Sequence, residues 1–180
     1  MNKLFALAFL GLTTSIAHAQ TTPLTKGRGL LSGSIGYQSV KYRGSESQDL
    51  FTFSPTVGYF VADNLAIGLN GNLQTYGSGA YGTNNFSVGP FVRYYRFVGG
   101  SDKFALYGQG GVGYRHYSGS YRMGYVDITP GLAFFPVPRF GLEASLRGLS
   151  YSSNFNDTHS FDFGLSLQNI QLGAAYYFGK

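Results

Sequence analysis

The chain has 180 residues, the size of a single domain, and charged residues make up only 12% of it. Its 13 basic residues outnumber its 8 acidic ones but form no run, which argues against nucleic-acid binding because that function needs a concentrated basic surface. Cysteine is absent, so disulfide scaffolds and cysteine-ligated metal sites are excluded.

Residues 1–19 predict a cleavable secretion signal. Lys3 precedes a short apolar stretch, and the small residues Ala17 and Ala19 follow it. This order is typical of a signal peptide cut after Ala19, and the apolar stretch is too short for the about 20 residues of a membrane-spanning helix. Residues 20–180 then form one exported domain. Its net charge is +4, because removal of Lys3 leaves 12 basic residues and 8 acidic ones.

The exported part has the pattern of a strand protein. Glycines interrupt every long segment, and apolar residues alternate with small or polar ones, as in "SPTVGYFVADNLAIGL" (54–69). Related stretches recur as "GPFVRYY" (89–95) and "TPGLAFF" (129–135), each followed by a turn and another alternating segment. This repeat predicts consecutive β-hairpins. The predicted strands are residues 29–41, 50–61, 64–76, 86–97, 103–117, 123–136, 139–152 and 160–178.

The predicted connections alternate in length. Those after the second, fourth and sixth strands are short, and those after the first, third and seventh are longer and polar; the loop after the fifth, "SGSYR", is an exception. Short turns at one end and long loops at the other are typical of outer-membrane barrels, which also have even strand numbers. Strands in hydrocarbon must close on themselves to pair every backbone group. We therefore predict an all-β fold, an eight-stranded antiparallel up-and-down transmembrane β-barrel.

Aromatic residues gather at two levels of this predicted barrel. One level, near the short turns, contains the aromatic residues at the ends of the descending strands. A looser level near the long loops contains Tyr37, Tyr76, Tyr114, Tyr151 and Phe161. Two levels are expected where a barrel meets two membrane–water interfaces. The predicted girdle near the short turns consists of Tyr59, Phe60, Tyr94, Tyr95, Phe134, Phe135, Tyr176, Tyr177 and Phe178.

Two features interrupt the pattern. Pro55, Pro90 and Pro130 fall inside predicted strands, where proline removes a ladder hydrogen bond and often marks a bulge. We expect three bulges at one level of the barrel. The last strand changes phase from odd to even apolar positions, which predicts a further bulge near residues 168–170.

The chain resembles the bacterial outer-membrane β-barrel domain family, the small OmpA/OmpX-like barrels. The resemblance rests on the signal, the "SPTVGYF…NLAIGL" hairpins, "GQGGVGY" and the closing "IQLGAAYYF", and it covers the whole exported chain. It implies an outer-membrane location, contact with outer-membrane lipid and insertion by the barrel-assembly machinery. The family's closing signal usually ends on the aromatic residue, whereas Gly179 and Lys180 follow Phe178 here. We expect a monomer that presents loops 42–49, 77–85 and 152–160 for recognition or has a structural role.

Inward-facing charges are predicted from the parity of three strands and the hairpin at "FPVPRF". Folding back around that turn places Arg147 nearly opposite Asp127, with Arg115 a diagonal step away. Glu143 and Arg93 would lie lower down. An eight-stranded barrel is only wide enough for its own side chains, so these charges would neutralise one another and plug the interior without a large pore.

Two other functions compete with this prediction. His116 and Ser118 are similar to the His-x-Ser of outer-membrane lipid A deacylases, but Pro130 stands where the acid is expected and Asp127 faces the other way. A soluble lipocalin-like barrel would bind a small apolar ligand, but it would need its apolar residues inside. The sequence therefore indicates no catalytic residue, cofactor or metal site, and we predict a non-enzymatic protein.

Overall fold

The computed structural model describes residues 24–40, 48–77, 83–118, 121–146, 148–154, 159–164 and 170–179. The predicted signal lies outside this part of the chain. No helix among the described residues is long and apolar enough to cross a membrane. The described residues form ten β-strands: β1 (Gly29–Val40), β2 (Gln48–Ala62), β3 (Leu65–Tyr76), β4 (Thr83–Phe97), β5 (Phe104–Tyr117), β6 (Tyr121–Val137), β7 (Phe140–Ser145), β8 (Leu149–Ser153), β9 (His159–Phe163) and β10 (Gln171–Phe178).

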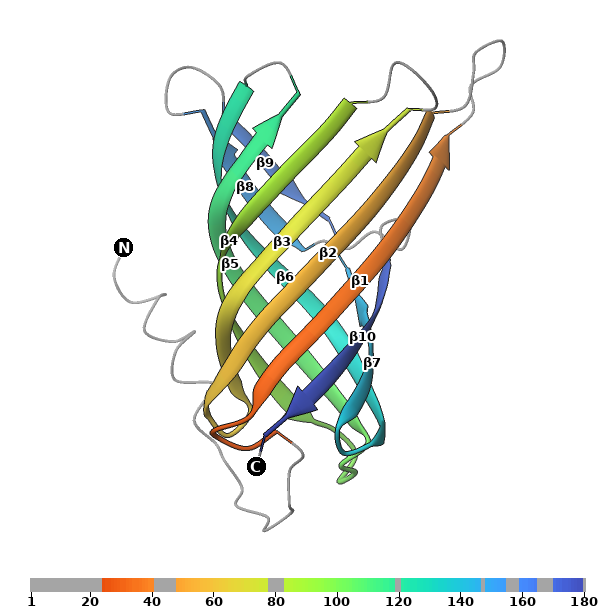
Figure 1. Cartoon of the computed structure of the whole chain (residues 1–180), viewed down its shortest axis with the longest axis vertical. Helices are drawn as coiled ribbons and strands as arrows, with labels where there is room; N and C mark the ends of the chain where they lie inside the picture. The colour runs from red at the N-terminus through yellow and green to blue at the C-terminus, as the bar shows by residue number, and fades with distance from the viewer. Residues whose placement is uncertain are drawn as a thin grey trace.

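The strands close into a barrel of eight antiparallel positions (Figure 1). Each strand from β1 to β6 pairs with the next, and β10 pairs with both β7 and β1 to complete the ring. Above β7 and β10, the short strands β8 and β9 continue the wall, with β8 paired to both β6 and β9. The prediction of an eight-stranded antiparallel barrel is confirmed. Closure matters because a closed sheet leaves no edge at the joined strands.

The short connections lie together at one end of the barrel, the lower end in Figure 1. Asn64 in the β2–β3 turn has φ 63°, a left-handed conformation that Asn tolerates better than most residues. Gly99 and Gly100 in the β4–β5 turn have φ 70° and 66°, where a Cβ would be strained. The predicted long loops are mostly outside the described residues. β2 and β4 extend into two of them, since they begin at Gln48 and Thr83.

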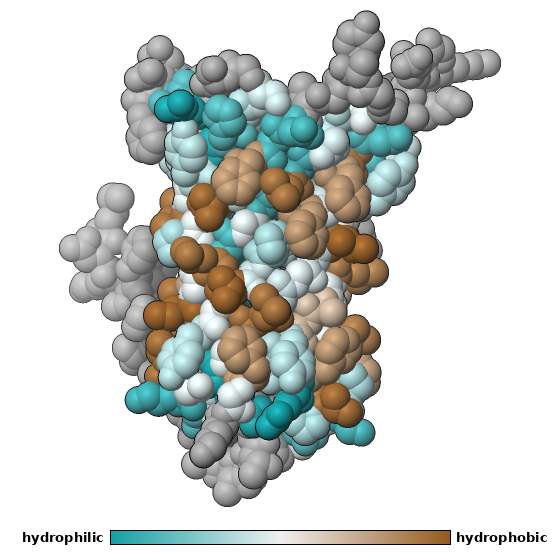
Figure 2. Space-filling view, viewed as in Figure 1, coloured by the Kyte–Doolittle hydropathy of each residue, from teal (hydrophilic) through white to brown (hydrophobic). Residues whose placement is uncertain are grey.

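The apolar face of the wall points outwards. On β2, Val57 is 51% exposed and Tyr59 is 52% exposed, whereas Thr52 and Thr56 of the same strand are each 6% exposed on the inner face. The same alternation continues around the ring, because successive residues of a strand point to opposite faces. Apolar side chains form a band around the middle of the visible surface, and hydrophilic residues lie above and below it (Figure 2). An inverted barrel with an apolar interior pocket does not fit this arrangement.

A hydrophobic core fills the interior near the short turns. Its members come from strands all around the ring and from the segment that precedes β1. Their aromatic rings pack at centroid distances between 5.4 and 6.5 Å, the separation at which tilted and edge-to-face pairs are favourable. These contacts pack side chains from most strands of the ring against one another across the interior at this end. The core consists of Leu24, Leu30, Phe60, Ala66, Phe91, Tyr95, Ala105, Tyr107, Ala133, Phe135, Ala175 and Tyr177.

The strand prolines do not mark three bulges at one level. The β2–β3 register is the same on both sides of Pro55, and the β4–β5 register is the same on both sides of Pro90, so the expectation of bulges there is wrong. Pro55 and Pro90 each interrupt one ladder locally without a slip, because proline lacks only its own N–H. Pro55 points outwards between Gly33 of β1 and Gly71 of β3, and a Cβ at Gly71 would lie only 3.3 Å from the proline ring. Pro130 lies opposite the break in the neighbouring wall that follows β7.

The last two predicted strands are interrupted. Predicted strand 139–152 is divided into β7 and β8, and the pairing to β6 shifts by one residue across the division. Predicted strand 160–178 is divided into β9 and β10. The expected phase change is confirmed, since Phe161 and Phe163 point outwards from β9 whereas Leu172 and Tyr176 do so from β10. The bulge predicted at 168–170 lies almost wholly outside the described residues.

Candidate functional site in the barrel interior

A buried ion pair joins two strands that are not neighbours. Arg93 of β4 and Glu143 of β7 lie 3.0 Å apart (Nη1 to Oε1), with side chains only 6% and 7% exposed. Arg93 Nη1 donates to both carboxylate oxygens, and its Nε donates to Gln109 Oε1 at 2.8 Å. Such pairing is necessary because an isolated buried charge is very costly. The pair ties β4, β5 and β7 together across the interior.

Tyrosine hydroxyls complete this network. Tyr95 and Tyr177 donate to Glu143 Oε1 at 3.2 and 3.1 Å, and Arg93 donates to the Tyr95 hydroxyl at 2.9 Å. The Arg93 guanidinium also lies over the Tyr107 ring, 4.6 Å from its centroid, in a cation–π contact. The aromatic core thus contacts the charges through its polar ends. We call this layer the floor: Arg93, Tyr95, Tyr107, Gln109, Glu143 and Tyr177.

The structure divides the nine predicted girdle residues by direction. Adjacent residues of one strand cannot share a face, so each predicted aromatic pair has one member outside and one inside. The inward members are buried in the core: Phe60, Tyr95, Phe135 and Tyr177. The outward members lie on the apolar surface near the short turns and remain the candidates for a membrane girdle: Tyr59, Tyr94, Phe134, Tyr176 and Phe178.

The upper charges of the predicted cluster are spaced by the strand register. Asp127 of β6 lies opposite Gly111 of β5, whereas Arg115 lies opposite Met123. Four residues of β5, roughly 13 Å of strand, therefore separate the levels of Arg115 and Asp127. The Arg115 guanidinium lies over the ring of Tyr125, 5.1 Å from its centroid, at the level between them. The side chain of Arg147 lies outside the described part of the structure.

Glycine makes room for the inward acid. A Cβ at Gly111 would come within 2.5 Å of Asp127 Oδ1, so a larger residue there would displace the carboxylate. The same relationship holds lower down, where a Cβ at Gly131 would overlap the ring of Tyr107. These two glycines therefore set where the interior side chains lie.

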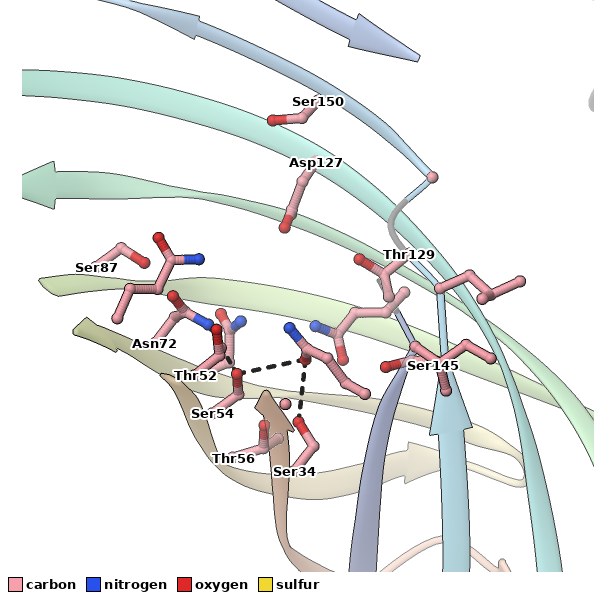
Figure 3. A pocket seen from close by; sticks show the side chains of 18 of the residues that line it. Ser34, Thr52, Ser54, Thr56, Asn72, Ser87, Asp127, Thr129, Ser145 and Ser150 are labelled. Atoms are coloured by element: carbon pink, nitrogen blue, oxygen red, sulfur yellow. Dashed lines mark hydrogen bonds between the residues drawn. The ribbon is translucent and has the colours of Figure 1, made fainter. Parts of the chain in front are cut away.

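A polar cavity of about 350 Å³ lies above the floor (Figure 3). Hydroxyl and carboxamide side chains from most strands of the ring point into it. Asn72 Nδ2 donates to Ser54 Oγ at 2.8 Å, and Gln171 Oε1 accepts from Ser34 Oγ at 3.1 Å. The barrel interior thus has two parts, an aromatic and ionic floor and a hydrophilic cavity above it.

The His-x-Ser pair lies at the upper end of β5. Ser118 Oγ accepts from the backbone N–H of Asn84 at 3.0 Å and donates to the Asn84 carbonyl at 2.8 Å. These two bonds connect the end of β5 to the start of β4. His116 pairs in register with Phe86 and Arg122. No group of three or more His, Asp or Glu side chains that could hold a metal is found among the described residues.

Sequence reasoning missed the inward direction of the floor tyrosines Tyr95 and Tyr177. Tyr95 and Tyr177 were assigned to the outer girdle, although Tyr95 is two residues from the inward Arg93 and must share its face. Strand parity could therefore have found Tyr95. Its bond to Glu143 depends on how the strands stagger around the barrel, which a single sequence does not specify.

Comparison with known proteins supports the fold. No protein-family model and no curated protein sequence matches the chain. Among solved structures, the N-terminal β-barrel domain of Pseudomonas aeruginosa OprF is similar with TM-score 0.51 at 17% identity, covering 86% of this chain and 98% of that one. Outer membrane protein OprG from P. aeruginosa has TM-score 0.48 at 13% identity, covering 87% and 98%. The attachment invasion locus protein Ail of Yersinia pestis has 0.47 at 19%, covering 86% and 100%.

Of these three, the OprF domain alone exceeds a TM-score of 0.5, and its low identity makes the likeness one of fold. The predicted resemblance to small outer-membrane barrels is therefore confirmed at the level of architecture. Function does not follow from a shared architecture, since one fold supports many roles.

Proposed function

We propose that this chain is an integral outer-membrane β-barrel protein with a structural or surface-recognition role and no enzymatic activity. The observation that carries the proposal is the direction of the side chains: the wall is apolar outside and polar inside. Soluble proteins rarely expose a continuous apolar band of this kind, whereas a transmembrane barrel requires one. The likeness to the OprF barrel domain supports the same location.

The outward aromatic residues near the short turns supply the expected interfacial girdle. Tyr59, Tyr94 and Tyr176 are each about half exposed, near the ends of β2, β4 and β10. Tyrosine suits this position because its ring enters the hydrocarbon while its hydroxyl stays hydrated. The partners that follow are outer-membrane lipid and, during insertion, the barrel-assembly machinery.

The floor argues against a large open pore through this barrel. Charges that are paired and surrounded by aromatic rings fill the interior near the short turns. The function then resides at the surface, where loops 42–49, 77–85 and 152–160 would meet an extracellular partner. A single closed barrel satisfies its own backbone, so we propose a monomer.

Membrane fractionation with gel mobility tests this proposal. The full chain would be expressed in a Gram-negative host, and outer membranes would be compared boiled and unboiled on a denaturing gel. The proposal predicts an outer-membrane band whose mobility changes on boiling, because a closed barrel resists detergent until heated. A soluble periplasmic product without a mobility change would contradict it.

A further inference from the structure

We propose that the cavity above the floor binds a small neutral molecule rich in hydroxyl groups, about the size of a monosaccharide. This goes beyond the envelope role proposed above, which needs no ligand inside the barrel. The cavity volume of about 350 Å³ is near the lower end of the about 300–1,000 Å³ range of small-molecule sites.

The lining chemistry favours a neutral ligand. Two of the charged side chains that reach the cavity, Arg93 and Glu143, already neutralise each other in the floor at 3.0 Å. Arg115 lies over Tyr125, and Asp127 lies against Gly111 on another level of the wall. An ionic ligand would lose its hydration without a concentrated countercharge to replace it.

The same lining disfavours an apolar ligand. Hydroxyls and carboxamides both donate and accept hydrogen bonds, so they complement a ligand whose groups also do both. A hydrocarbon in the cavity would displace water from these groups without replacing the hydrogen bonds that the water made. A sugar or polyol would replace them. The neighbouring strands β10, β1, β2 and β3 contribute Ser34, Thr52, Ser54, Asn70, Asn72 and Gln171 to this lining.

Part of this wall is already organised for binding. Ser54 receives a hydrogen bond from Asn72 at 2.8 Å and lies 3.5 Å from Gln171 Oε1, which Ser34 also approaches (Figure 3). These bonds fix side chains from β1, β2, β3 and β10 in one constellation, which lowers the entropy cost of binding.

The floor sets the direction from which a ligand would enter. The aromatic core fills the interior near the short turns, whereas the lining of the cavity extends upwards to Gln38 and Tyr76 at the other end of the wall. A solute would therefore come from the long-loop side.

Saturation-transfer NMR on the purified full chain tests the proposal. The barrel would be prepared in a detergent without a sugar headgroup, and glucose would be the probe, with acetate and benzene as charged and apolar comparisons. We expect transfer to glucose that exceeds transfer to the other two. No transfer to glucose would mean that the cavity holds water only and would overturn the proposal, as would equal transfer to benzene or acetate.

Paired variants locate the binding. Asn72→Leu removes a cavity amide, whereas Asn84→Leu changes an exposed asparagine outside the cavity. We expect Asn72→Leu to weaken glucose binding about tenfold, the effect of losing one good hydrogen bond, and Asn84→Leu to leave it unchanged. Equal binding by both variants would overturn the assignment to this cavity.

A third variant keeps the test informative if Asn72→Leu does not fold. Thr52→Val keeps the shape of a buried cavity residue and removes its hydroxyl. The heat-dependent gel shift of each variant shows whether the barrel is folded, independently of glucose binding. A folded barrel that binds no glucose contradicts the ligand proposal alone, whereas absence of the gel shift in the unmodified chain contradicts the barrel proposal. If Thr52→Val folds and binds glucose as tightly as the unmodified chain does while Asn72→Leu fails to fold, the cavity is not the binding site.

Discussion

Arg93 and Glu143 form an ion pair across the barrel, although the two strands that carry them are separated in the ring by β5 and β6. Both side chains are almost fully buried. Arg93 also donates to Gln109 and Tyr95, and Glu143 also accepts from Tyr95 and Tyr177. Removal of one partner would leave an uncompensated charge in the interior. We therefore expect Arg93→Leu to lower the free energy of unfolding by about 3–5 kcal/mol.

Urea unfolding in lipid vesicles measures this effect. The matched comparison is Arg93→Leu combined with Glu143→Leu, which removes both charges and should cost much less than the single change. If the double variant lost as much stability as the two single variants together, the pair would not be coupled in the folded barrel.

A second prediction concerns the space that Gly131 leaves for the Tyr107 ring of the floor. Gly131→Ala places a methyl group where the Tyr107 ring now lies, whereas Gly108→Ala on the neighbouring strand meets open space outside the wall. We expect Gly131→Ala to reduce stability by about 1–3 kcal/mol through overpacking. Gly108→Ala should change it little. Urea midpoints of the two variants check the contrast, and equal midpoints would contradict the described packing.

The third prediction concerns the unbulged proline of β2. Pro55 lacks the N–H that would extend the ladder to β3, yet the register continues past it. Pro55→Val would restore that donor at an outward position where an apolar side chain faces lipid. The added hydrogen bond stabilises the folded barrel, whereas loss of the proline ring gives the unfolded chain more conformational entropy. Because the two effects oppose each other, we expect the free energy of unfolding to change by no more than about 1 kcal/mol.

Equilibrium unfolding and the heat-dependent gel shift of Pro55→Val test this. Glu143→Leu, a change in the buried floor, is the comparison that should lose several times more stability. Loss of the folded band in Pro55→Val would contradict the prediction, because it would mean that the barrel needs proline at this position.

The fourth prediction concerns conduction. The proposal that the aromatic and ionic floor leaves no large pore predicts that planar-bilayer recordings of the unmodified chain show no stable large conductance. Replacement of Tyr95 and Tyr177 by alanine would remove two of the largest buried side chains and should produce small conductance steps. A stable large conductance from the unmodified chain would contradict the closed floor.

Much of the fold could be predicted from local pattern. Alternation along 54–69 determines which residues share a face, and the proline–aromatic repeat marks three descending strands. Both features depend on residues two apart or one hairpin apart. They were therefore readable without knowledge of how the strands meet around the ring.

The departures arise from longer-range geometry. The break after β7 shifts the pairing to β6 by one residue, and no local signal at Leu146 or Gly148 distinguishes it from an ordinary strand. Pairing register places Arg115 opposite Met123, so the predicted diagonal step from Arg115 to Asp127 is wrong. Asp127 itself lies opposite Gly111 of β5 and Ser150 of β8, and not opposite Arg147 as predicted. Interior contacts such as Arg93 with Glu143 depend on the stagger of the whole barrel.

The most direct test of the central claim is to measure which face of β3 meets lipid. Because the chain has no cysteine, single cysteines at successive positions from Ala66 to Leu73 can each carry a nitroxide spin label without background labelling. In lipid vesicles, accessibility to oxygen should peak at the outward positions Ile67, Leu69 and Leu73 and fall at Asn70 and Asn72. The opposite phase, or high accessibility to a water-soluble nickel complex at the apolar positions, would contradict a membrane-spanning barrel.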